Sequence, residues 1–126
     1  MRTRISIIVG ALTIALGIAG CSGHGRSSTK IVSGGSAEHG SRLIVRYGCG
    51  SCHTIPGVKG ASALVGPPLI HWSRRSFIAG RLANTPDNLI RWISDPQGVE
   101  PGVDMPNLGV TQDDARDIAA YLEGIR

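Results

Sequence analysis

The chain has 126 residues, enough for one small domain and an appendage. Aromatic side chains offer little bulk for a core, because there are only five: Trp72, Trp92, Tyr47, Tyr121 and Phe77. The formal net charge is +4, but the 13 Lys and Arg residues form no basic run, which argues against nucleic acid as a partner.

Residues 1–20 have the composition of a signal peptide, with Arg2 and Arg4 before an uncharged run at 5–20. A membrane-spanning helix needs about 20 residues, so this run is short for one. Residues 18–21, Ile-Ala-Gly-Cys, resemble the lipobox of bacterial lipoproteins. The resemblance implies lipid on Cys21 and a domain on the periplasmic or extracytoplasmic side of a bacterial membrane. The alternative is an ordinary cleavage site that happens to precede a cysteine.

Residues 21–35 contain eight Gly or Ser and show no apolar periodicity. They predict a flexible tether that would hold a domain roughly 20 Å from a bilayer, at about 5 to 6 Å times the square root of its length. His24 and Lys30 are expected to be solvated.

A helix is predicted from Ser36, as N-cap, to about Gly48. Its apolar face consists of Leu43, Ile44 and Tyr47. His39 in the first turn is expected to be a surface polar residue and not a ligand. This helix delivers the motif that follows.

Cys49-Gly50-Ser51-Cys52-His53 fits the pattern by which haem c is attached. Two thiols three positions apart can each form a thioether with one vinyl group of the haem. His53 follows as the proximal axial ligand of the iron. Gly50 and Ser51 are small, which predicts that the ring edge lies close to the backbone of this turn.

Two other interpretations of the motif are weaker. Structural zinc needs four ligands, usually from two such pairs, and the chain has no second pair. A thioredoxin-like pair would sit among alternating strands and helices, whereas short helical patterns broken by Gly and Pro follow here. A bound haem would also supply the apolar bulk that the sequence lacks. With Cys21 lipidated, all three cysteines have roles and no disulfide is predicted.

The segment 54–69 is rich in Gly and Pro and predicts a loop. The motif followed by Gly66-Pro67 and Leu69 is similar to class I, single-haem c-type cytochromes. That resemblance implies an all-α fold over 36–126, with three main helices and short helical turns around one covalent haem c. It also implies that the Pro67 carbonyl accepts a hydrogen bond from His53.

Arg75 occupies the spacing at which this family often places an Arg near a haem propionate. The alternative is a solvated helix residue, and Arg74 could take either role. Residues 73–79 predict a short helix that Gly80 ends.

Thr85 and Pro86 predict the N-cap and first residue of the next helix. The helix should stop before Asp95-Pro96, because the residue preceding a proline disfavours helix. Its apolar residues are Leu89, Ile90, Trp92 and Ile93. Trp92 is expected in the core, which in a cytochrome means near the haem.

Met105 lies on a loop bounded by Pro101 and Pro106, 52 residues after His53. A thioether is the usual partner of a proximal His in electron-transfer cytochromes, so Met105 is the predicted second axial ligand. The alternative is a Met that fills a gap in the core. His71 is the main rival ligand, but it follows the Gly66-Pro67 segment too closely to cross easily to the far face.

The last helix is predicted to open at Thr111, with Asp113 and Asp114 in its first turn. In class I cytochromes such a helix crosses the N-terminal one. Small residues that could allow a close approach are Gly40, Ala119 and Ala120.

Two stretches, GPPLIHWSRRSFIAGRLANTPDNLIRWISDPQ and PGVDMPNLGV, resemble the cytochrome c domain fused to subunit II of some haem-copper terminal oxidases. The likeness implies a respiratory electron carrier, not an enzyme, whose partners include such an oxidase. Nothing upstream could form the copper domain, so we expect a separate, tethered protein. A haem subunit of a larger oxidoreductase, or a ligand-binding or peroxidase-like protein if Met105 is not bound, remain as alternatives.

Charge is distributed unevenly along the expected mature chain. Without Arg2 and Arg4 it carries 13 − 2 = 11 basic and 9 acidic residues, a net charge of +2 that two haem propionates would offset. Basic residues precede the methionine loop: Lys59, Arg74, Arg75, Arg81 and Arg91. Acidic residues gather near the end: Asp113, Asp114, Asp117 and Glu123. This asymmetry could steer a partner with an acidic patch.

Overall fold

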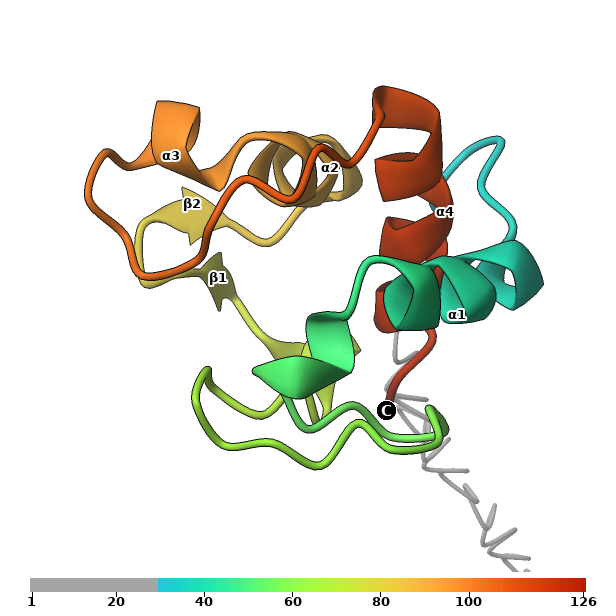
Figure 1. Ribbon diagram of the computed structural model, residues 1–126. Helices are drawn as coiled ribbons and strands as arrows, with labels where there is room; N and C mark the ends of the chain where they lie inside the picture. Colours follow the sequence, from blue (N-terminus) through green and yellow to red (C-terminus); the bar gives the residue numbers. More distant parts are fainter. Residues whose placement is uncertain (1–29) are drawn as a thin grey trace, which may run out of the picture.

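The computed structural model describes residues 30–126, so the predicted signal peptide, Cys21 and His24 lie outside the described residues. The helices are α1 (Ala37–Arg46), α2 (Pro86–Ser94), α3 (Pro96–Val99) and α4 (Gln112–Glu123), with the 3-10 turns η1 (Cys49–Ser51) and η2 (Trp72–Arg74). Among the described residues a single hairpin, of β1 (Phe77–Ile78) and β2 (Leu82–Ala83), accompanies them (Figure 1). Helices thus dominate, which confirms the predicted all-α class. In this part of the chain no helix combines the length and apolarity needed to cross a bilayer.

The three longer helices begin where the sequence predicts. Ser36, Thr85 and Thr111 each accept, through the side-chain hydroxyl, a hydrogen bond from the backbone N–H three residues later. Each cap satisfies one of the amide groups that a helix start leaves unpaired. α1 ends at Arg46, slightly before the predicted end, and α3 was not predicted.

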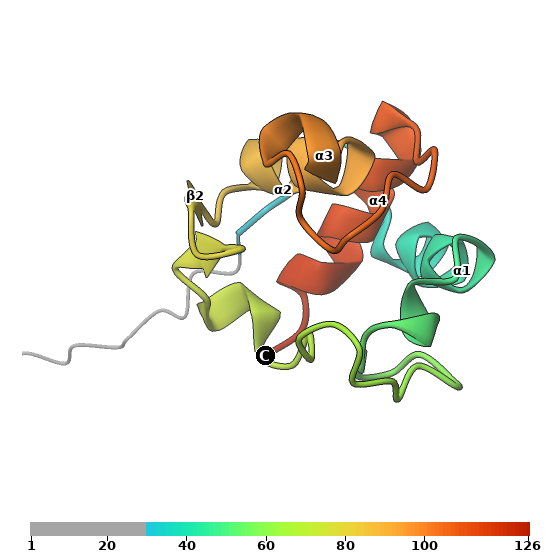
Figure 2. The same cartoon turned by 60° about the vertical axis from the view of Figure 1, so that its left-hand side comes forward.

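The core forms where α4 packs against both α1 and α2 (Figures 1 and 2). At Gly40 a Cβ atom would lie 2.0 Å from the Asp117 carbonyl oxygen, so the α1–α4 crossing requires glycine there. Ala119 is fully buried. The predicted close approach of the terminal helices is therefore confirmed.

His39 belongs to this helix crossing. Its Nδ1 lies 2.7 Å from Asp117 Oδ2, and Asp117 Oδ1 accepts a hydrogen bond of 2.7 Å from the Ser36 N–H. The Asp117 carboxylate thus ties the start of α1 to α4.

The helix predicted over 73–79 is wrong. After η2 the chain extends into β1 and turns through Ala79 and Gly80, which both have left-handed backbone conformations. The Asn84 side-chain amide donates to the carbonyls of Trp72 and Arg75. Those carbonyls are therefore engaged by a side chain instead of by a continuing helix.

The predicted tether ends too late, because the described residues 30–35 pack on the domain. Val32 is buried in the core, and Lys30 Nζ donates to the Arg75 carbonyl at 3.1 Å. Lys30 Nζ also lies 3.8 Å from a carboxylate oxygen of Glu123, whose side chain is 1% exposed. Lys30 is therefore not a freely solvated residue, and Glu123 does not belong to an acidic surface cluster.

Candidate functional site

The Cys-x-x-Cys-His segment is a tight turn placed directly after α1. Gly48, with a φ of 72°, redirects the chain from the helix into η1. The His53 N–H then donates to the Cys49 carbonyl at 3.0 Å, which brings the two cysteines and the histidine onto one turn. Cys49 and Cys52 are both free thiols.

Gly50 has a packing role that was not predicted. A Cβ atom at this position would lie 2.8 Å from Ala61 Cβ, so the small residue lets the 54–61 loop pack against the turn. Ser51 is exposed, and its hydroxyl donates to the Gly48 carbonyl at 2.7 Å. Both contacts stabilise the turn from the protein side.

His53 is oriented by the segment that contains Gly66 and Pro67. Its Nδ1 lies 2.8 Å from the Pro67 carbonyl oxygen, which is the hydrogen bond that the resemblance implied. At Gly66 a Cβ atom would lie 2.5 Å from His53 Cε1, so the backbone at residue 66 lies directly against the imidazole. The Gly66 N–H in turn donates to the Cys52 carbonyl at 2.7 Å. With Nδ1 engaged as a donor, Nε2 is left with the lone pair that binds a metal.

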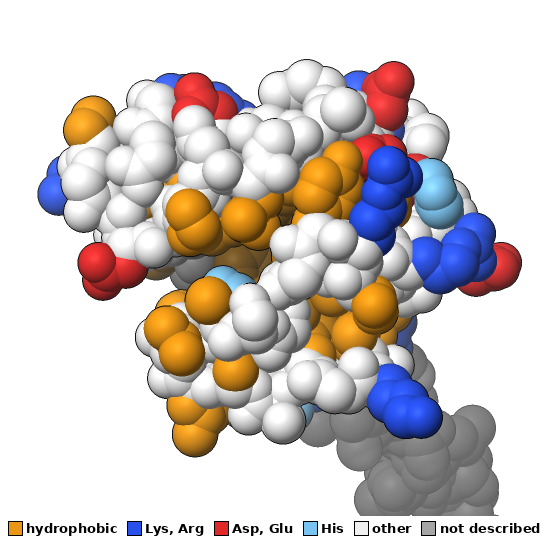
Figure 3. Space-filling view, viewed as in Figure 1, with side chains coloured by type: hydrophobic (Ala, Val, Ile, Leu, Met, Phe, Trp, Pro, Cys, Tyr) orange, Lys and Arg blue, Asp and Glu red, His pale blue; other side chains and the backbone are white. Residues whose placement is uncertain are grey.

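The surface is hollowed between the part of the fold that carries η1 and the part that carries α2 and α3. Figure 3 shows this hollow, where hydrophobic side chains gather and histidine colour appears at the edge. Cys49 and Met105 are both partly buried against the core. Burial raises the pKa of the Cys49 thiol above its ordinary value, as expected beside an apolar space.

These features accommodate a covalent haem. The turn offers two free thiols at the required spacing, an imidazole held by one nitrogen, and a glycine that keeps the space beside the ring clear. An apolar hollow supplies the surroundings that a porphyrin needs. The residues present therefore fit haem c.

The loop that carries Met105 is held by Gln97 on α3 and by Asp95, the residue that precedes α3. Asn107 Nδ2 donates to Asp95 Oδ1 at 3.0 Å, and the Gln97 N–H donates to Asn107 Oδ1 at 3.3 Å. This places Met105 on a braced loop with its side chain against the core. Its role as an iron ligand stays a prediction.

The other residues considered for the site, Arg75, Trp92 and His71, lie in different parts of the fold. The Arg75 guanidinium donates to the carbonyls of Pro68 and Ile70 and lies 5.1 Å from the centre of the Trp72 ring. It therefore joins η2 to the loop that follows Pro67, and its contact with a propionate stays a prediction. Trp92 is buried in the core on α2, as expected. His71 is exposed, with a positive φ of 50°.

Two supporting residues escaped the sequence reasoning. Asn84 is 4% exposed and holds the backbone between η2 and β1, where a helix was expected. Gln97 is engaged with the methionine loop through its side chain. No local sequence signal indicated Gln97, because its partners are backbone groups of the 102–105 segment.

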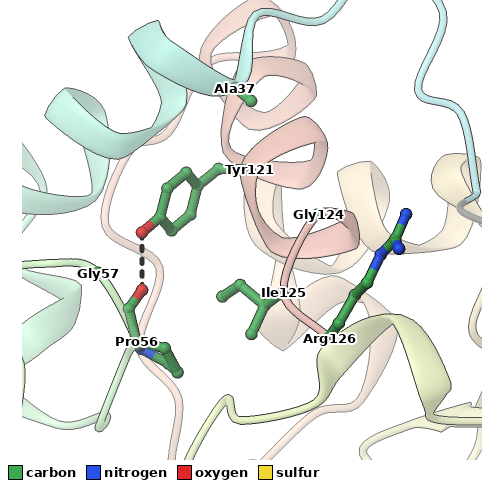
Figure 4. Close-up of a pocket in the computed structure, with 7 residues that line it drawn as sticks. All are labelled: Ala37, Pro56, Gly57, Tyr121, Gly124, Ile125 and Arg126. Carbon is green, nitrogen blue, oxygen red and sulfur yellow. Dashed lines mark hydrogen bonds between the residues drawn. The ribbon is translucent and has the colours of Figure 1, made fainter.

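A second depression, of about 450 Å³, lies at the end of α4. Its lining includes Pro56, Tyr121 and Ile125 (Figure 4). The Tyr121 hydroxyl donates to the Pro56 carbonyl at 2.7 Å and joins α4 to the loop after the haem motif. No predicted site residue within 30–126 lines this depression, so we assign a structural role to the hydrogen bond between Tyr121 and Pro56.

Comparisons with known proteins agree with this geometry. The family model described as Cytochrome c matches residues 37–126. Cytochrome c oxidase subunit 2 of Alkalihalophilus pseudofirmus is 32% identical over 91 residues, which cover 71% of this chain and 26% of that protein. Cytochrome c oxidase subunit 2 of Bacillus subtilis is 30% identical over 96 residues, again with 71% and 26% covered. The chain thus spans about a quarter of the length of these curated relatives.

Proposed function

The chain belongs to the cytochrome c family, and on that premise we propose that it is a lipid-anchored carrier that moves single electrons between respiratory partners. Members of the family hold haem c covalently and carry electrons; they are not enzymes in their own right. The electron-carrier part of the proposal rests chiefly on the hydrogen bond from His53 to the Pro67 carbonyl. It orients an imidazole beside two thiols that can hold the haem.

We assign four residues of the domain over 36–126 to the haem. Cys49 and Cys52 would hold it covalently, and His53 and Met105 would be the side chains that bind its iron. Bound haem supplies a reversible Fe(III)/Fe(II) couple. If His53 and Met105 both bind the iron, they would leave no place on it for a substrate, and the chemistry that the group would supply is electron transfer.

Binding of a small ligand to the haem iron tests the proposed ligation by Met105. We expect carbon monoxide to bind the reduced holoprotein slowly and weakly, because Met105 must first leave. Rapid and tight binding would contradict the carrier function and favour a gas-binding or peroxidase-like protein.

Anchoring is proposed through lipid on Cys21, after removal of residues 1–20. The proposal rests on the signal-like composition and on the lipobox resemblance. Full-length protein made in a bacterium should partition into the detergent phase, and a Cys21→Ser variant should stay in the aqueous phase. Equal partitioning of the two proteins would contradict the anchor.

A terminal oxidase is the proposed electron acceptor. Both relatives named above are oxidase subunits, and the matching region is about a quarter of each. A second candidate follows from the same likeness, namely a fixed subunit of a larger oxidase. Mild detergent extraction separates the two, because a fixed subunit emerges with its partner chains and a free carrier emerges alone.

A further inference from the structure

We infer that Gln97 is the residue that positions Met105 for the iron, an inference that rests on the proposed ligation by Met105. Gln97 lies on α3 and is half-buried. Its Nε2 donates to the Val103 carbonyl at 2.5 Å and to the Met105 carbonyl at 2.8 Å. Its Oε1 accepts a hydrogen bond from the Gly102 N–H at 3.2 Å.

The chemistry of a primary amide explains why glutamine stands here. The loop presents two carbonyl oxygens and one N–H to a single side chain. Only an amide offers two N–H donors and a carbonyl acceptor at one end. A glutamate has no donor when ionised and would place negative charge against two carbonyl oxygens. A leucine of similar size would leave all three loop groups without this partner.

The support for Gln97 is itself rigid. Pro96 is buried, and Asp95 Oδ1 accepts hydrogen bonds from the Gly98 N–H at 2.9 Å and from Asn107 Nδ2 at 3.0 Å. The Gln97 side chain therefore holds the loop from Gly102 to Met105, and Asp95 and the Gln97 N–H hold it at Asn107. Movement of the Met105 backbone requires the loss of several of these hydrogen bonds. Gln97 thus limits the freedom of the thioether and favours the bound arrangement.

The Gln97→Glu substitution tests this inference in the haem-loaded, full-length protein. It keeps the size of the side chain and removes both donors. The matched control is Gln112→Glu, which makes the same change at an exposed site on α4. The readouts are the weak near-red sulfur-to-Fe(III) band, the reduction potential and the affinity of the oxidised protein for added imidazole.

At neutral pH we expect Gln97→Glu to weaken the near-red band, lower the potential and raise the imidazole affinity at least tenfold, while Gln112→Glu matches wild type. Acidification below about pH 4.3, the ordinary value for a glutamic acid, should restore part of the band relative to wild type at the same pH. A protonated carboxyl regains one donor. A purely structural role for Gln97 would lower the melting temperature without these changes.

Two outcomes would overturn different statements. A near-red band in wild type that is unchanged in Gln97→Glu, with unchanged potential and imidazole affinity, contradicts the role of Gln97. Absence of the band from wild type contradicts ligation by Met105.

In that event hydrogen exchange at the Gly102 amide still tests the loop contact, because Gln97→Leu should accelerate it. Equal exchange in wild type and Gln97→Leu would show that Gln97 does not hold the loop.

Discussion

The orientation of His53 depends on the absence of a side chain at position 66. The Pro67 carbonyl fixes Nδ1, and the Gly66 backbone occupies the space against Cε1. An axial histidine held in this way keeps one tautomer and one ring orientation, which raises its basicity toward the metal. Backbone atoms of Gly66 and Pro67 therefore set the orientation in which His53 would bind the proposed iron.

Gly66→Ala should disturb the proximal side without preventing haem attachment. The new methyl group would overlap the imidazole and lengthen the hydrogen bond to Pro67. Loss of such a supporting contact typically weakens metal binding about 10- to 100-fold. We expect a mixture of low-spin and high-spin iron in the optical spectrum, with the haem still covalently bound. Lys59→Ala is the control, because it truncates an exposed side chain of the same loop and leaves every glycine in place. A wild-type spectrum for Gly66→Ala would contradict this account of His53.

The residue motifs were largely predictable from sequence, because their chemistry is local. The thiol spacing, the adjoining histidine and the helix caps need no distant partner to be recognised. The roles of Gly50 and Gln97 depend on contacts with Ala61 and with the 102–105 backbone. Neither partner can be identified from local pattern alone, so these roles became apparent only in the folded chain.

At the scale of elements, the fold depends on the crossing of α1 and α4. Gly40 allows the two backbones to approach, and Asp117 binds both the Ser36 N–H and the His39 ring. The sequence predicted the crossing from the family resemblance and the small residues. It did not predict the hairpin, because the side chain of Asn84 engages the carbonyls that a helix over 73–79 would use.

Gly40→Ala should separate α1 from α4. The added methyl group meets the Asp117 carbonyl, which is backbone and cannot move alone. Overpacking of this kind typically costs about 1 to 3 kcal/mol, and we expect a loss of about 3 kcal/mol in the free energy of unfolding. Denaturant titration of the holoprotein measures it. The control, Arg42→Ala, removes an exposed ion pair on the same helix and should cost about 0.5 kcal/mol. Equal stabilities for the two variants would contradict the close crossing.

Acid should weaken the same crossing through Asp117. The Ser36 N–H, followed by the His39 side chain, lowers the pKa of this carboxyl below its ordinary value. A lowered pKa in the folded state adds stability above the unfolded pKa of about 3.9, and this stability is lost as the pH falls through the folded value. Asp117→Asn should therefore be less stable than wild type at neutral pH, with a difference that vanishes in acid. Asp113→Asn, at an exposed position on α4, serves as the control. A difference that persisted unchanged into acid would contradict this linkage.

At the scale of the whole molecule, the domain begins earlier than composition suggested. Gly34 and Gly35 were interpreted as tether residues, but Gly35 lies so close to α4 that a Cβ atom there would be 2.8 Å from Ala120 Cβ. With Lys30 held by Glu123 and Arg75, only residues 22–29 remain between the proposed lipid and the domain. Nine residue steps from Cys21 to Lys30 span at most roughly 30 Å. Composition alone cannot separate a packed glycine from a mobile one.

Charge on the molecular surface should influence the encounter with a partner. Arg74 and Arg91 are exposed, whereas Glu123 is buried and Asp114 accepts a hydrogen bond from the Tyr47 hydroxyl. Charge reversal at Arg74 and Arg91 should slow oxidation by an acidic partner several-fold at low salt, and salt should reduce the difference. Stopped-flow rates at two ionic strengths measure this effect. Rates that do not change at low salt would exclude steering by these residues.

The central claim is that His53 and Met105 together hold the iron. Its most direct test is the near-red sulfur-to-Fe(III) band of the oxidised holoprotein, recorded beside a Met105→Ala variant. We predict that wild type shows the band and that the variant loses it while keeping its covalent haem. A wild-type spectrum that lacks the band and has a high-spin form would contradict the claim. Binding of small ligands at an open iron position would then replace electron transfer as the proposed function.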